Sequence, residues 1–265
     1  MAADAASAQQ AQQMPFIKNL ASSDRKLRTE SLTSLQSFLA SRPSLSPLDA
    51  RKLWTGLYYA LWMTDRPRPQ QALAADLANL AHGLRDACVE PWCAAFWAVL
   101  GAQWPHIEAL RLDKFLLLVR RVFAAHVRVV KERGYEGDVV EGVKRVLAGW
   151  CFDKEDENRV ALGLRLHVLD VWVDELEREG VLGAAAAEGD EGAKGFVEFV
   201  GALVEGLKRC PVKSVRQRAQ DSHDDERLPW AQKKEDGDEG EEEEGEGEAG
   251  EMGGEQDGEW GGIEN

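Results

Sequence analysis

The chain lacks the residue patterns that mark most enzymes and metalloproteins. Its four cysteines form no CxxC pair and have no histidine at zinc-ligand spacing. No phosphate loop, GxSxG elbow, HExxH or GxGxxG motif occurs in a suitable context. We therefore predict no enzymatic activity, no catalytic, cofactor-binding or metal-binding residues, and no small-molecule substrate. The cysteines are expected to be free, mostly buried thiols in a reducing compartment: Cys88, Cys93, Cys151 and Cys210.

Long apolar runs and a secretory leader are also missing. No stretch reaches the roughly 18 apolar residues that a membrane span needs. No basic segment followed by an apolar run opens the sequence. Nor does any segment alternate polar and apolar residues over a useful length, which argues against β-strands. These absences predict an intracellular, soluble, helical protein with no membrane contact.

The acidic character of the chain is confined to its C-terminal end. The formal net charge is −15, yet residues 221–265 alone hold 19 acidic and 3 basic residues, so residues 1–220 are nearly neutral. The end is almost entirely Glu, Gly and Asp, which cannot bury a core and which repel one another. We expect 221–265 to be a disordered acidic tail, 1–13 a disordered N-terminus, and 14–220 an all-helical, repeat-like domain.

Apolar residues recur at helical spacing through the body of the chain. Ser22 to Asp24 provides N-cap chemistry for a helix that Pro43 closes, and Ser46 and Pro47 open the next one. Further helices are expected over 73–84, 91–103, 108–132, 137–150, 158–179 and 193–209. About eight helices joined by short turns predict an all-α fold of stacked antiparallel helix pairs, a solenoid of the HEAT or armadillo type, although no repeat of about 34 or 40 residues is visible.

A proline-stiffened turn, TDRPRPQQ, is expected at residues 64–71. Its two arginines, Arg66 and Arg68, would lose little entropy on binding, and a guanidinium group matches both phosphate and carboxylate. Together with Gln70 they are candidate contacts to RNA or to a protein partner. The alternative is that Asp65 or a helix C-terminus pairs with both arginines.

The helix expected at 108–132 carries a second basic candidate. At 100° per residue its cations Arg111, Lys114, Arg121 and Arg128 fall at about 0°, 300°, 280° and 260°. They lie opposite the apolar stripe, as the phosphate-contacting face of a helix would. A solvated face with intramolecular salt bridges gives the same pattern, so both interpretations stay open.

Several other residues have a structural interpretation beside a functional one. His126 lies on the apolar face of its helix without a nucleophile partner, so a hydrogen-bonded core or boundary histidine is favoured over a catalytic base, and His167 is interpreted in the same way. The acidic cluster 153–157 fits a solvated, helix-capping loop better than a cation site. The LPWAQ segment (228–232) is either a docking motif for a partner groove or a linker with a spare tryptophan.

Three segments of the chain are distinctive: LWTGLYYALWMTDRPRPQQALAADLANL (53–80), FWAVLGAQWPHIEALRLDKFLLLVRRV (96–122) and GLRLHVLDVWVDEL (163–176). With PFIKNLASSDRKLRTESL (15–32) upstream, they resemble the eukaryotic ribosomal RNA processing protein 1 family over about residues 15–210. The resemblance implies a non-catalytic nucleolar scaffold bound to pre-ribosomal particles and needed for pre-rRNA processing on the large-subunit side. Its implied partners are other ribosome assembly factors and, in places, rRNA. Many members of the family carry long, charged C-terminal extensions. If these extensions are basic, the acidic tail of this chain departs from them, and no Lys/Arg-rich nuclear import signal is visible.

A rival hypothesis from another functional class also fits the sequence. A cytosolic helical-repeat adaptor, or an acidic chaperone for basic clients, would use the flexible polyanion to attract cations and would have no ribosomal role. Deletion of residues 221–265 separates the two hypotheses, because a chaperone would lose its clients and a scaffold would keep its particle.

Overall fold

A computed structural model describes residues 15–155, 160–187 and 189–231, and within these ranges the chain is helical with no strand. The expected N-terminal segment 1–13 and residues 232–265 of the expected tail lie outside the described residues. The all-α prediction is confirmed. In chain order the elements are α2 (Pro15–Lys18), η1 (Asn19–Ala21), α3 (Arg25–Ser41), α4 (Pro47–Trp62), α5 (Pro67–Asn79), η2 (Leu80–Gly83), α6 (Asp86–Gln103), η3 (Trp104–His106), α7 (Ala109–Glu132), α8 (Asp138–Val146), η4 (Leu147–Cys151), α9 (Leu162–Arg178), α10 (Val181–Ala186), α11 (Glu191–Leu207) and α12 (Lys213–His223).

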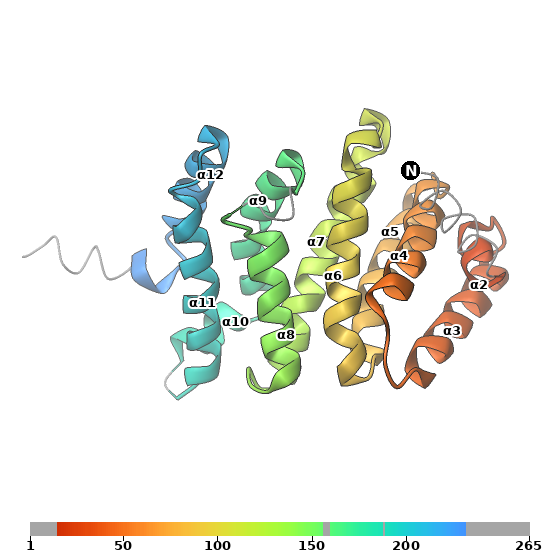
Figure 1. The fold of residues 1–265 in the computed structure, drawn as a ribbon, viewed down its shortest axis with the longest axis horizontal. Helices are drawn as coiled ribbons and strands as arrows, with labels where there is room; N and C mark the ends of the chain where they lie inside the picture. The colour runs from red at the N-terminus through yellow and green to blue at the C-terminus, as the bar shows by residue number, and fades with distance from the viewer. Residues whose placement is uncertain (1–14, 156–159, 188, 232–265) are drawn as a thin grey trace, which may run out of the picture.

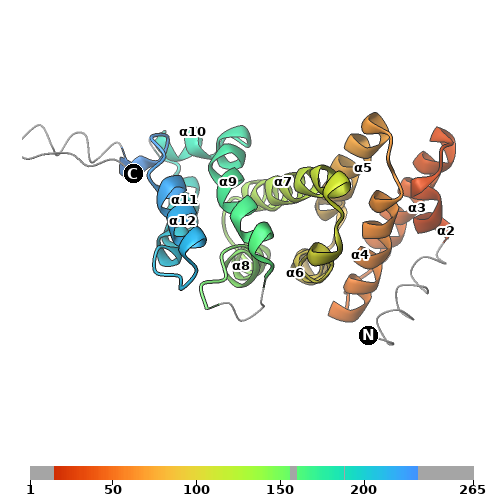
Figure 2. The same ribbon diagram turned by 90° about the horizontal axis from the view of Figure 1, so that it is seen from above.

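The helices stand side by side as antiparallel pairs: α4 with α5, α6 with α7, α8 with α9, and α11 with α12 (Figure 1). Seen from above, α4, α6 and α8 form one layer and α5, α7 and α9 the other (Figure 2). Packing follows these layers, because α6 contacts α4 and α8, while α7 contacts α5 and α9. This is the expected solenoid of stacked helix pairs. The four turns inside the pairs all lie along the upper edge in Figure 1.

Local capping explains where the first two long helices begin. The Asp24 side chain accepts a hydrogen bond from the Lys26 backbone N–H at 2.8 Å and so caps α3. The Ser46 hydroxyl accepts one from the Asp49 N–H at 3.1 Å, and Pro47 takes the first helical position of α4. Both caps satisfy N–H groups that have no partner within the helix, and both confirm the expected positions.

Two helices begin earlier than the sequence pattern predicts. Residues 67–71 were expected within a turn, but α5 already begins at Pro67, so the turn is limited to residues 64–66. Pro67 and Pro69 are tolerated because they occupy the first and third helical positions, where the missing N–H would have no helical acceptor. Likewise, α6 begins at Asp86 and contains Pro91, which was expected to start it.

The core between the layers is rich in aromatic side chains. The largest fully buried side chains include Trp92, Trp97 and Trp172. The Trp54 indole N–H donates to the Trp92 carbonyl at 3.0 Å, so a polar group of this core is paired. All four cysteines are free and buried, as expected. Burial raises the pKa of the Cys93 thiol to about 12, so this thiol stays protonated at neutral pH.

Helical packing continues past residue 220, where the acidic tail was expected to begin. Helix α12 reaches His223, and Leu228 is fully buried. The Trp230 indole N–H donates to the His223 carbonyl at 2.8 Å, and its ring covers Gly201 of α11 so closely that a Cβ at position 201 would overlap it. The tryptophan of the LPWAQ segment therefore packs inside this molecule. Gln232 of that segment lies outside the described residues.

We expect Gly201→Ala to displace Trp230 and to loosen residues 224–231. Because the ring occupies the position of the new methyl group, the substitution should lower the free energy of unfolding by about 1–3 kcal/mol. Urea unfolding measures this loss, and trypsin should cleave faster after Arg227. Gly195→Ala on the same helix is the matched control, because a Cβ there meets nothing within 4 Å, and it should be neutral or slightly stabilising. Equal effects of the two substitutions would contradict the expected overlap.

Candidate interaction surface

The α4–α5 turn is held in place by a buried lysine of α7. Lys114 is only 3% exposed, and its ammonium group donates to the carbonyls of Trp62 (2.7 Å) and Thr64 (3.1 Å) and to the carboxylate of Asp65 (3.0 Å). The Trp62 carbonyl is the last of α4 and the Thr64 carbonyl follows two residues later, where no further helical N–H groups are available, so Lys114 caps this helix end from another helix. The hydrogen bond from Lys114 also lowers the pKa of Asp65.

Arg111, which precedes Lys114 by one helical turn of α7, contacts the same α4–α5 turn. Its Nε lies 3.7 Å from the Asp65 carboxylate, and its guanidinium lies over the Trp62 ring at 5.1 Å from the centroid. It also pairs with Glu108. For Arg111 and Lys114, the interpretation as intramolecular salt bridges therefore describes the structure.

Arg66 is exposed on this supported turn, and Arg68 is exposed in the first turn of α5, which follows it directly. Asp65 is engaged by Lys114 and Arg111, and within the described residues neither Asp65 nor a helix C-terminus pairs with the side chain of Arg66 or Arg68. Gln70 is half-buried in the first turn of α5, and its backbone N–H donates to the Arg66 carbonyl at 3.0 Å. The turn thus presents two guanidinium groups whose backbone is already fixed.

The rest of the basic stripe divides into a paired and an unpaired residue. Arg128 donates from Nε (2.9 Å) and Nη2 (2.7 Å) to Glu179 and from Nη1 to Asn79 (3.1 Å), so it links α5 with the end of α9. Its hydrogen bonds lower the pKa of Glu179. Arg121 is exposed and has no partner in the part of the chain that the structure describes. Of the four stripe cations, Arg121 is therefore the one best placed to meet another molecule.

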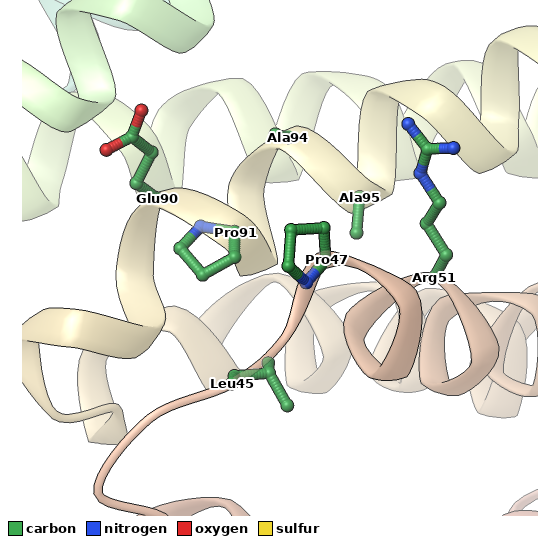
Figure 3. Close-up of a pocket in the computed structure, with 7 residues that line it drawn as sticks. All are labelled: Leu45, Pro47, Arg51, Glu90, Pro91, Ala94 and Ala95. Carbon is green, nitrogen blue, oxygen red and sulfur yellow. The ribbon is translucent and has the colours of Figure 1, made fainter.

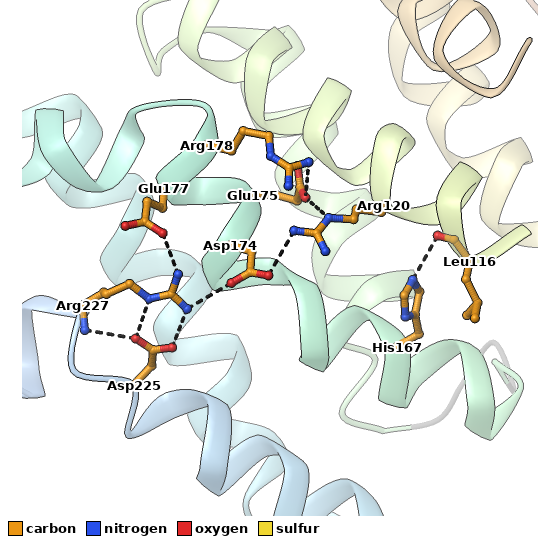
Figure 4. A network of polar contacts seen from close by, with 9 residues as sticks. All are labelled: Leu116, Arg120, His167, Asp174, Glu175, Glu177, Arg178, Asp225 and Arg227. Atoms are coloured by element: carbon orange, nitrogen blue, oxygen red, sulfur yellow. Dashed lines mark hydrogen bonds and ion pairs between the residues drawn. The ribbon is translucent and has the colours of Figure 1, made fainter. Parts of the chain in front are cut away.

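Arg120, which lies apart from the stripe on the helical wheel, stands at the centre of a polar network (Figure 4). It pairs with Asp174 at 3.0 Å and with Glu175, a fully buried carboxylate that also receives Arg178 at 3.1 Å. From the segment after α12, Arg227 reaches Asp174 (3.1 Å), Glu177 (2.6 Å) and Asp225 (2.7 Å), and it lowers the pKa of Asp225. The network joins α7, α9 and residues 225–227.

The two central histidines have structural roles. His126 is 1% exposed, and its Nε2 accepts a hydrogen bond from the Trp97 indole N–H at 3.1 Å. Burial lowers its pKa to about 3, so the ring is neutral. The Nε2 of His167 donates to the Leu116 carbonyl at 3.0 Å (Figure 4), and burial lowers the pKa of His167 as well. Both are hydrogen-bonded, His126 in the core and the half-buried His167 at its boundary, which confirms the interpretation as core or boundary histidines.

We expect the free energy of unfolding to fall by about 2 kcal/mol between pH 7 and pH 5 through His126 alone. The pKa of His126 is about 3 in the folded chain and 6.5 ordinarily. Between these values the histidine is protonated in the unfolded chain but neutral in the folded chain. The stability that the neutral His126 contributes is therefore fully present above pH 6.5. Below that pH the free energy of unfolding falls by up to about 1.4 kcal/mol per pH unit. Urea unfolding at several pH values measures the slope.

His126→Gln is the control for this pH dependence. Glutamine keeps an acceptor for Trp97 but does not titrate, so the variant should show a smaller slope. A residual slope of the same sign is expected, because burial also lowers the pKa of His167. Identical slopes for wild type and variant would contradict the assignment to His126.

A shallow groove of about 350 Å³ lies between the first turns of α4 and the first half of α6 (Figure 3). Arg145 holds Glu90 at one end through two hydrogen bonds of 3.0 and 2.7 Å. Arg51 is exposed at the other end. Between these charges the walls are apolar, so the groove could accept an apolar side chain. It is lined by Leu45, Pro47, Arg51, Glu90, Pro91, Ala94 and Ala95.

The acidic cluster 153–157 is described only in part, because residues 156–159 lie outside the described residues. Asp153 is buried, and its backbone carbonyl accepts from Arg165 at 2.9 Å. Within the described ranges, no three His, Cys, Asp or Glu side chains gather closely enough to hold a metal ion. None of the helices described is both long and apolar enough to cross a bilayer.

Comparison with known proteins gives a consistent result. The family model described as "Nucleolar protein, Nop52" matches residues 11–261. The human ribosomal RNA processing protein 1 homolog B is 29% identical over 183 residues, which cover 66% of this chain and 24% of the relative. The mouse homolog A is 27% identical, covering 63% of this chain and 35% of the relative, and the Drosophila melanogaster homolog is 28% identical, covering 72% and 28%.

The chain spans between about a quarter and about a third of the length of these relatives. The matched segment contains the described helices and with them the α4–α5 turn, helix α7 and the polar network of Figure 4. Because the family model covers nearly the whole sequence, the chain belongs to the Nop52 family of nucleolar proteins.

Proposed function

We propose that this chain is a non-catalytic scaffold of ribosome biogenesis. It acts in the nucleolus, within the nucleus, and supports pre-rRNA processing and large-subunit assembly by binding other assembly factors and rRNA in the pre-ribosomal particle. Membership of a nucleolar family and relatives named ribosomal RNA processing proteins support this role. The stacked-pair architecture supports it as well, since such solenoids expose long surfaces for binding.

The observation that carries the proposal furthest is the pair of unpaired arginines on the α4–α5 turn. A surface that binds another molecule gains most when its charged groups are already fixed and not satisfied internally. Lys114 and Arg111 fix the turn and occupy Asp65, which leaves Arg66 and Arg68 available. In this proposal Gln70 and Arg121 extend the contact, and Arg128 supports it by holding α7 between α5 and α9.

We expect Arg66→Glu/Arg68→Glu to reduce co-sedimentation with pre-ribosomal particles at least tenfold. Reversing two charges removes two charge-assisted contacts and adds repulsion, and a tenfold loss corresponds to only about 1.4 kcal/mol. Lys18→Glu/Arg25→Glu makes the same charge change at exposed residues near the N-terminal end of the described region and should leave binding intact. Unchanged association of the first variant, with an unchanged unfolding curve, would exclude the turn as a contact.

The acidic chaperone remains the second candidate, favoured by the charge of residues 232–265. The packing of Trp230 shows where a deletion must begin, because removing 221–265 would also remove residues that stabilise α11 and α12. Deletion of 232–265 is the clean experiment. A scaffold keeps its particle and its nucleolar signal when the tagged protein is imaged, whereas a chaperone loses its basic clients and gives a diffuse cytosolic signal.

A further inference from the structure

One edge of the solenoid carries a row of exposed aliphatic side chains. Among the described residues six large hydrophobic side chains are exposed, and four of them lie at the turns inside the helix pairs, along the upper edge in Figure 1. Each turn supplies one. They are Met63 (67% exposed), Leu110 (98%), Leu162 (46%) and Val212 (38%).

Contacts between the first three turns make this part of the edge a continuous surface. The first turn meets the second through Asp65, which pairs with Lys114 and Arg111. The Trp104 ring of the second turn lies against Gly163 at the start of α9, close enough that a Cβ there would stand 2.8 Å from the indole nitrogen. Because neighbouring packed helices stand about 8–10 Å apart, the row places an aliphatic side chain at roughly that interval.

The unpaired positive charge of the edge lies beside Met63, whereas Asp113, one helical turn after Leu110, is an exposed carboxylate. Between Met63 and Leu110, the carboxylates of Asp65 and Glu108 are engaged by α7, whereas the side chains of Arg66 and Arg68 have no partner in the described ranges. A molecule that covers this region must therefore offer apolar surface and negative charge together.

We infer that this edge binds a protein segment in which aliphatic side chains about 10 Å apart are flanked by carboxylates. Met63 and Leu110 contact the aliphatic side chains, and Arg66 and Arg68 pair with the carboxylates. A Leu side chain that is 98% exposed gains from burial against apolar groups, which a phosphate backbone does not supply. The inference rests on the proposed function in one respect, namely that the segment belongs to an assembly factor in the same particle.

RNA fits this edge less well because the two tryptophan rings beside its first two turns, Trp62 and Trp104, are already engaged. Binding of unpaired bases uses aromatic faces as stacking platforms. Trp62 is half-buried beneath Arg111, and the half-buried Trp104 packs on α9. The large hydrophobic side chains that remain open to solvent along the row are aliphatic.

Photo-crosslinking in cells that express the full chain tests the inference. Benzoylphenylalanine is placed at position 110, at position 63, or at position 48 as the control, because Leu48 is 61% exposed but lies at the start of α4, on the opposite edge. We expect positions 63 and 110 to crosslink to one partner segment that contains aliphatic residues next to Asp or Glu, and position 48 not to do so. Adding Arg66→Glu/Arg68→Glu should reduce these crosslinks at least tenfold.

Four outcomes would overturn the inference: no crosslink from the edge, crosslinks to RNA, crosslinks to a segment without carboxylates, or the same segment captured from position 48. Particle co-sedimentation of the wild-type chain separates this inference from the proposed function. If the chain co-sediments and the edge crosslinks nothing, the scaffold role stands and the edge proposal fails. If the chain does not co-sediment but both edge positions capture one acidic-aliphatic segment, the edge proposal stands and the ribosomal role fails.

Discussion

Lys114→Met is expected to lower the free energy of unfolding by about 2–4 kcal/mol. The ammonium group is buried and satisfies two carbonyls at the end of α4 as well as the Asp65 carboxylate. A methionine fills the same volume but donates no hydrogen bond, so buried acceptors lose their partner at about 1–3 kcal/mol each. Urea unfolding at pH 7 measures the difference.

The same substitution should also weaken particle association, although Lys114 itself is not accessible to a partner. Without the lysine the α4–α5 turn loses its attachment to α7, so Arg66 and Arg68 must be ordered at the moment of binding. Arg111→Met is the matched control, because Arg111 contacts the same Asp65 from a position 30% exposed and should lose about 1 kcal/mol or less. Equal destabilisation by the two variants would show that Lys114 is not the principal support of the turn.

Much of the fold was predictable because apolar periodicity and capping are local signals. Asp24 and Ser46 cap their helices where the sequence indicated. The start of α5 was missed because proline suggests a turn wherever it occurs, although the first helical turn accepts it equally well. Helix α12 was missed for a different reason: among its residues only Val215 and Ala219 are buried, too few to give a periodic pattern.

The candidate surface was only partly predictable, because its pairing depends on distant segments. The helical wheel placed Lys114, Arg121 and Arg128 on one stripe, but it could not show that Lys114 meets Asp65, 49 residues earlier, or that Arg128 meets Glu179, 51 residues later. Those partners decide which cation is free. The row of exposed aliphatic side chains could not be predicted from the sequence either. Nothing in the sequence distinguishes the exposed Leu110 from the buried Leu118 of the same helix, because the difference arises from how α7 packs in the solenoid.

Arg120→Leu should destabilise the fold by about 3–5 kcal/mol. Glu175 has no exposed surface and is paired with Arg120 and Arg178, so removal of Arg120 leaves a buried carboxylate with a single, half-exposed partner. Glu175→Leu should cost less, because Arg120 is 28% exposed and keeps Asp174. The double variant Arg120→Leu/Glu175→Leu should be more stable than Arg120→Leu alone, since aliphatic side chains can pack between α7 and α9 without a buried charge.

Urea unfolding of the four proteins gives the coupling energy, which we expect to exceed about 2 kcal/mol. Arg145 and Glu90 provide the control cycle: their side chains are 62% and 42% exposed, so their coupling should be clearly smaller despite two good hydrogen bonds. Similar coupling in the two cycles would show that burial of Glu175 adds nothing. A larger coupling at Arg120 would instead establish that the junction between α7 and α9, on which the alignment of successive turns along the edge depends, is held by a buried ion pair.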